Sequence, residues 1–99
     1  MNQKEIIQTV QSRVSVLPHK DHIKRLALFG SVLHQTDNPR SDVDILIELK
    51  RPLGYFSLSQ IQRTLEEAVK GPVDLVTPHA LSKYFRNDVL DEAQTIYES

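Results

Sequence analysis

Three aspartates, Asp42, Asp44 and Asp74, have the residue type and spacing that best suit metal chemistry in this sequence. Asp42 and Asp44 are two residues apart, so on a β-strand both carboxylates point to one face with Cα atoms roughly 6.5–7 Å apart. Carboxylates placed in this way repel each other unless a cation lies between them. The chain has no cysteine, and oxygen ligands alone suit Mg²⁺ or Mn²⁺ rather than Zn²⁺.

Asp74 has apolar neighbours, because the segment around it reads Val-Asp-Leu-Val. An unpartnered carboxylate in an apolar setting is costly, which favours a shared cation. Structural alternatives remain open: Asp74 could be an edge-strand or capping carboxylate, and an isolated Asp-x-Asp after a turn is usually solvated. Glu48 shares the strand face of Asp44 but lies about 13 Å from it along the strand, too far to bind the same ion.

Gly30 and Ser31 follow the apolar run Leu26 to Phe29. Glycine would let the backbone approach a phosphate closely, and Ser31 would offer a hydroxyl and an amide N–H. If a helix begins there, its free N–H groups add to an anion site. Taken alone, a Gly-Ser pair after a strand is usually just a turn, so its interest depends on the aspartates that follow.

The elements that must position these residues alternate between helix and strand. Apolar periodicity predicts helices over residues 3–17, 57–69 and 79–98, with a brief one at 31–35, and strands over 26–29, 42–49 and 73–77. A break in the last helix near Arg86-Asn87 is left open. Ser57 and Gln60 form a capping-box pattern, and Gly71-Pro72 ends the same helix. The order predicts one α/β (α+β) domain over 1–99, with helices packed on a small mixed sheet of three to four strands.

Composition limits the classes of function. Lys and Arg number 12 and Asp and Glu 13, a formal net charge of −1 that argues against non-specific duplex binding. A small polyanion is still allowed, because a metal ion supplies positive charge locally. Apolar runs fall short of the ~20 residues that span a bilayer, and the N-terminus lacks an apolar signal segment, so we expect a cytoplasmic protein without membrane contact.

The spacing of these motifs resembles a known family. Gly30-Ser31, ten intervening residues and then Asp42-Val43-Asp44 resemble the GS-x10-DxD motif of the polymerase β-like nucleotidyltransferase superfamily. The short chain, VDLVTP at 73–78 and DEAQTIYES at 91–99 are similar to its minimal (MNT) branch, which includes the antitoxins of HEPN/MNT toxin–antitoxin pairs.

The resemblance implies a fold and a role for each residue. It implies the nucleotidyltransferase fold, with Asp42 and Asp44 binding two Mg²⁺ ions. Asp74 would be the third metal ligand and candidate base, and Gly30 and Ser31 would contact the triphosphate. The implied reaction transfers AMP from ATP to a hydroxyl, with a tyrosine of a HEPN ribonuclease toxin as the acceptor.

Two further functions remain open. Many relatives carry arginines after the Gly-Ser pair, whereas this chain has Val-Leu-His-Gln at 32–35. A catalytically weak or inactive module that neutralises the toxin by complex formation is therefore the alternative hypothesis. Transfer to a small molecule or nucleic acid is a third, and the near-neutral charge argues against nucleic acid. Self-association is left open.

Overall fold

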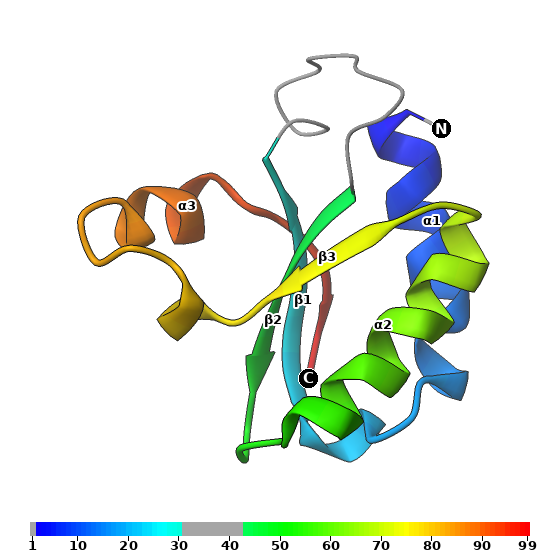
Figure 1. The fold of residues 1–99 in the computed structure, drawn as a ribbon. Coiled ribbons are helices and arrows are strands. Elements are labelled where there is room, and N and C mark those ends of the chain that lie inside the picture. Colours follow the sequence, from blue (N-terminus) through cyan, green and yellow to red (C-terminus); the bar gives the residue numbers. More distant parts are fainter. Residues whose placement is uncertain (1, 31–42) are drawn as a thin grey trace.

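The computed structural model describes residues 2–30 and 43–99, which form a mixed sheet with helices on both sides (Figure 1). The helices are α1 (Gln3–Arg13), α2 (Tyr55–Val69) and α3 (Arg86–Glu92), and the strands are β1 (Ile23–Phe29), β2 (Val43–Leu49), β3 (Val73–Val76) and β4 (Gln94–Glu98). Short 3₁₀ turns occupy Val14–Val16, Lys20–His22 and Pro78–Ala80.

The sheet has four strands in the order β3-β2-β1-β4. The central strand β1 pairs antiparallel with both β2 and β4, and β2 pairs parallel with β3. Parallel neighbours need a crossover connection, and α2 supplies it between β2 and β3. Among the described strands, β3 and β4 form the two edges of the sheet.

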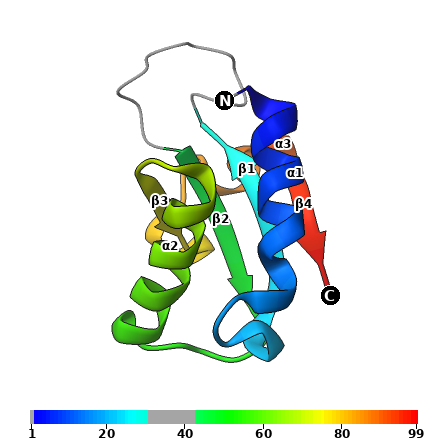
Figure 2. The same cartoon turned by 90° about the vertical axis from the view of Figure 1, so that its right-hand side faces the viewer.

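The main core lies between one face of the sheet and helices α1 and α2, which stand side by side in front of the strands in Figure 2. Alternate residues of each strand point to this face, and helix residues three or four apart meet them. Fully buried side chains on both sides of this interface include Leu26, Leu28, Ile45, Ile47, Ile61 and Leu65. Burial of apolar surface, worth about 25 cal/mol per Å², is thus concentrated on one face.

The opposite face of the sheet carries a smaller core. Ala27, Leu46 and Ala93 are buried there, and Phe29, Leu81 and Leu90 pack against them. Helix α3, which contributes Leu90, lies on this side of the sheet, away from α1 and α2 (Figure 1).

Most of the predicted elements are confirmed, but the C-terminal segment differs. The prediction of helix over 79–98 is wrong, because α3 ends at Glu92 and Gln94–Glu98 forms β4. The spacing of Val89, Ala93 and Ile96 mimicked a helical stripe, whereas the β-favouring residues Thr95 and Tyr97 pair with β1. The capping prediction is also wrong: α2 begins at Tyr55, and Gly54 is its N-cap.

Ser31 and Asp42 lie outside the described residues, as does the brief helix predicted at 31–35. The segment 32–35, where this chain lacks the arginines of many relatives, lies outside them as well. Within the residues that are described, the structure contains no helix long and apolar enough to cross a membrane.

Candidate functional site

Asp44 and Asp74 are direct register partners on the parallel strands β2 and β3. Adjacent strands lie about 4.8 Å apart, and residues in register point to the same face. Their chain neighbours Ile45 and Val73 are buried in the main core. Both carboxylates therefore lie on the opposite face of the sheet, the one that also carries α3, near the end of β2 that follows residue 42.

Gly30 lies directly against the carboxylate of Asp44. A Cβ atom built on Gly30 would lie 2.1 Å from Asp44 Oδ2 and 2.9 Å from Asp44 Cγ. The backbone of Gly30 also has φ +78°, a conformation that side-chain-bearing residues rarely adopt. The backbone conformation thus favours glycine at the end of β1, and the carboxylate of Asp44 occupies the space that a side chain would take, so a larger residue would have to displace it.

The two carboxylates differ in exposure. Asp44 is half-buried, whereas Asp74 is exposed on the edge strand β3. The expectation that the apolar neighbours of Asp74 would make an unpartnered charge costly is therefore wrong, because Val73 and Leu75 point to the other face. Register with Asp44, rather than burial, is what places Asp74 beside it.

The donors at this place fit a magnesium site in their chemistry. Two carboxylates from neighbouring strands, one of them open to solvent, match the preference of Mg²⁺ for a few carboxylates with remaining positions for water and phosphate. Across 2–30 and 43–99, no cluster of three or more His, Asp or Glu side chains could hold a metal ion. Asp42, the remaining predicted ligand, lies outside those ranges.

Glu48, on the same strand face as Asp44, takes part in a different interaction. Its Oε2 lies 3.1 Å from Arg25 Nη1, in a half-buried ion pair. Arg25 also donates from Nε to Thr95 Oγ1 at 2.9 Å and from Nη2 to the carbonyl of Ala93 at 3.2 Å. Arg25 therefore connects β1 to Glu48 of β2 and to Thr95 of β4.

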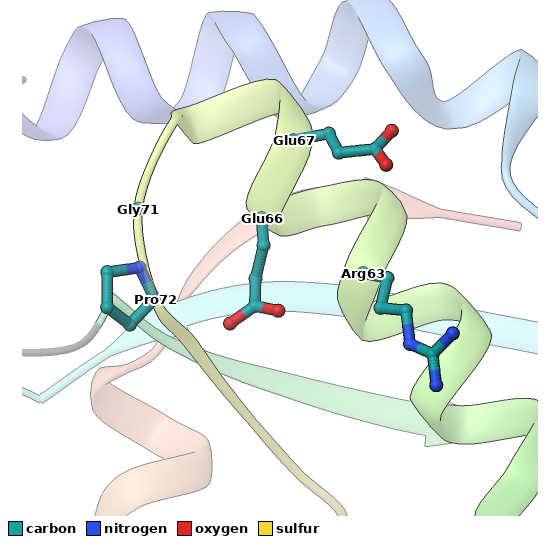
Figure 3. A pocket seen from close by; sticks show the side chains of 5 residues that line it. All are labelled: Arg63, Glu66, Glu67, Gly71 and Pro72. Carbon is teal, nitrogen blue, oxygen red and sulfur yellow. The ribbon is translucent and has the colours of Figure 1, made fainter.

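Two side chains of α2 contact β3 next to Asp74, and no motif in the sequence singled them out. Gln62 Nε2 donates to the carbonyl of Val73 at 2.8 Å, and the Val73 N–H donates to Glu66 Oε2 at 3.0 Å. Glu66 also lines an open depression with Arg63, Glu67, Gly71 and Pro72 (Figure 3). A polar i, i+4 pair on a helix that precedes a strand is the signal that could have found them.

The fold and parts of the sequence match known nucleotidyltransferases. A solved structure described as a candidate minimal nucleotidyltransferase superposes with a TM-score of 0.75 at 25% identity, covering 94% of each chain. A protein of Methanocaldococcus jannaschii, named as a candidate protein adenylyltransferase, is 26% identical over 88 residues, which cover 89% of this chain and 90% of that protein. The predicted nucleotidyltransferase fold is confirmed.

Two complexes share the fold at lower identity. One is a toxin–antitoxin with AMP-PNP, with a TM-score of 0.70 at 22% identity over 100% of this chain and 75% of that one. The other is a tri-AMPylated HEPN toxin of Shewanella oneidensis with its MNT antitoxin, with a TM-score of 0.65 at 19% identity over 100% and 74%.

The family assignment comes from the sequence model described as polymerase beta, nucleotidyltransferase. It matches residues 11–99, nearly the whole chain and every described strand. The chain therefore belongs to the polymerase β nucleotidyltransferase family and is an enzyme of the nucleotidyltransferase class.

Proposed function

We propose that this enzyme transfers AMP from ATP to a tyrosine hydroxyl of a HEPN-type toxin and so acts as its antitoxin. The single observation that carries the proposal is that Asp44 and Asp74 are register partners, with the backbone of Gly30 next to the Asp44 carboxylate. Support for the donor and the acceptor comes from the related proteins, one named for protein adenylyl transfer and one bound to an AMPylated HEPN toxin.

The reaction would be an in-line displacement at phosphorus. The tyrosine oxygen attacks the α-phosphorus of ATP, the bond to the bridging oxygen of the β-phosphate breaks, and pyrophosphate leaves. Asp74, which is exposed, is accessible to an incoming hydroxyl and would accept its proton. Asp44 and Asp74, together with Asp42, would hold two Mg²⁺ ions. When bound, Mg²⁺ would offset the charge of the triphosphate and of the leaving pyrophosphate.

The binding of ATP would begin at the end of β1. Gly30 has no side chain of its own, and the carboxylate of Asp44 fills the place that a Cβ would take. A metal ion held by Asp44 would therefore lie close to the backbone at the end of β1, where it could draw in the phosphates. Ser31 follows directly and would bind the triphosphate. Cytoplasmic location and a protein partner follow from the same proposal.

The test is to incubate the purified chain with ATP, Mg²⁺ and a candidate HEPN-type toxin. We expect the intact mass of that protein to rise by whole AMP units. Asp44→Asn and Asp74→Asn should each slow transfer by about 100-fold or more, because removing a group that stabilises transition-state charge costs that much. Asp21→Asn, an exposed aspartate in the Lys20–His22 turn, is the matched control and should keep full activity.

Two results would contradict this proposal. If the folded wild-type chain leaves the mass of the HEPN protein unchanged, it does not adenylylate this partner. If Asp44→Asn still suppresses the ribonuclease as well as wild type, neutralisation occurs by complex formation alone, the alternative favoured by the absent arginines at 32–35.

A further inference from the structure

The backbone N–H and carbonyl of Val73 point away from β2, the only strand that pairs with β3 among the described residues. In a parallel pair, one residue directs both its backbone groups to the neighbouring strand and the next directs both away. The Val43 N–H donates to the carbonyl of Pro72 at 3.1 Å, so Pro72 belongs to the inward set. Val73 belongs to the outward set, and its N–H and carbonyl would face solvent at this edge of the sheet.

Helix α2 satisfies both outward groups of Val73. Glu66 Oε2 accepts from the N–H at 3.0 Å, and Gln62 Nε2 donates to the carbonyl at 2.8 Å. Both bonds are partly buried, and the two side chains stand four residues apart, on one face of the helix. Figure 3 shows Glu66 directed from α2 toward the strand beside Pro72, whereas Glu67 points away from it.

The helix that carries this pair is itself fixed in place. Ile61, Leu65 and Val69 of α2 are buried in the main core, adjacent to the positions of Gln62 and Glu66. The two hydrogen bonds therefore connect a well-packed helix to a four-residue edge strand. Asp74 follows Val73 directly, and its exposed side chain has little packing of its own to place it.

We propose that Gln62 and Glu66 are positioning residues that fix β3 in register, so that the carboxylate of Asp74 lies opposite that of Asp44. The inference rests on the proposed function, in which these two aspartates hold the metal. Glu66 acts here through the hydrogen bond that it accepts and not through its charge. A neutral acceptor in its place therefore retains the effect, and an apolar residue does not.

The experiment measures Mn²⁺ binding by calorimetry in the presence of AMP-PNP, and amide hydrogen exchange of Val73 and Asp74 by NMR. In Gln62→Leu and in Glu66→Leu we expect Mn²⁺ to bind about three- to tenfold more weakly, the equivalent of one net hydrogen bond. The Val73 amide should exchange faster in Glu66→Leu. Glu66→Gln, which keeps an acceptor, and Glu67→Leu, an exposed neighbour on the same turn, should match wild type.

Each of the other outcomes overturns a defined part of the proposal. If Glu66→Gln weakens Mn²⁺ binding as much as Glu66→Leu, the charge of Glu66 acts directly and the positioning role is wrong. If Asp74→Asn weakens binding and the two leucine variants do not, the positioning role fails and the proposed metal site stands. If Asp74→Asn binds Mn²⁺ as wild type does, the metal site itself is misplaced and this inference falls with it.

Discussion

At Gly30, the local backbone and the Asp44 carboxylate together leave no room for a side chain. In Gly30→Ala, the new methyl group would overlap Asp44 Oδ2 and the residue would keep a positive φ. We expect a loss of about 1–3 kcal/mol in the free energy of unfolding, measured by urea denaturation. AMP transfer should fall by about 100-fold, because Asp44 must move to make space.

Gly71→Ala is the matched control for this substitution. A Cβ on Gly71 would meet no atom within 4 Å, so the expected change in unfolding free energy is within about 0.5 kcal/mol. A Gly30→Ala variant with wild-type stability and transfer would show that Gly30 does not confine the carboxylate of Asp44.

Among the elements, β4 differs most from its local sequence pattern, because the apolar spacing predicts a helix and the segment is a strand. Ile96 is buried in the main core, although the strand that carries it lies at an edge of the sheet. Ile96→Ala should lower the free energy of unfolding by about 2–4 kcal/mol, through lost burial and the cavity that remains. Urea denaturation measures this, with Gln94→Ala, an exposed residue of the same strand, as the control. Equal stability in both variants would mean that β4 does not pack as described.

The elements that the sequence predicted well are those in which the spacing of apolar residues fits only a strand or only a helix. Alternation from Val43 to Leu49 indicated β2, and the stripe Ile61, Leu65, Val69 indicated α2, and both are confirmed. The C-terminal strand could not be found in this way, because a short edge strand owes its conformation to pairing with β1, a contact across some seventy residues of chain.

The candidate site was predictable in part for the same reason. Alternation placed the side chain of Asp44 on the polar face, but the sequence does not reveal that β3 is an edge strand next to β2. The register of Asp44 with Asp74 depends on the order of the strands. The contact between Gly30 and the Asp44 carboxylate depends on how closely the end of β1 approaches β2. The anchoring of Val73 by Gln62 and Glu66 is likewise tertiary: their i, i+4 spacing indicates a shared helix face, but it does not indicate which strand that face contacts.

For the whole molecule, the two faces of the sheet differ in how much apolar surface they bury. One face buries its side chains under α1 and α2 and supplies most of the apolar core. The other has a small core of Ala27, Leu46 and Ala93, and this leaves Asp44 and Asp74 accessible beside it. Substitutions at these carboxylates should therefore change the chemistry without disturbing the main core.

The most direct test of the metal–nucleotide site is paramagnetic NMR on the wild-type chain with AMP-PNP and substoichiometric Mn²⁺. Broadening by Mn²⁺ depends steeply on distance, so the backbone amides that lose intensity first mark the site. We predict that these include Gly30, Asp44 and Asp74, and that the broadening disappears in Asp44→Asn. Broadening centred instead on Glu66 and Glu67, or retained in Asp44→Asn, would contradict the account.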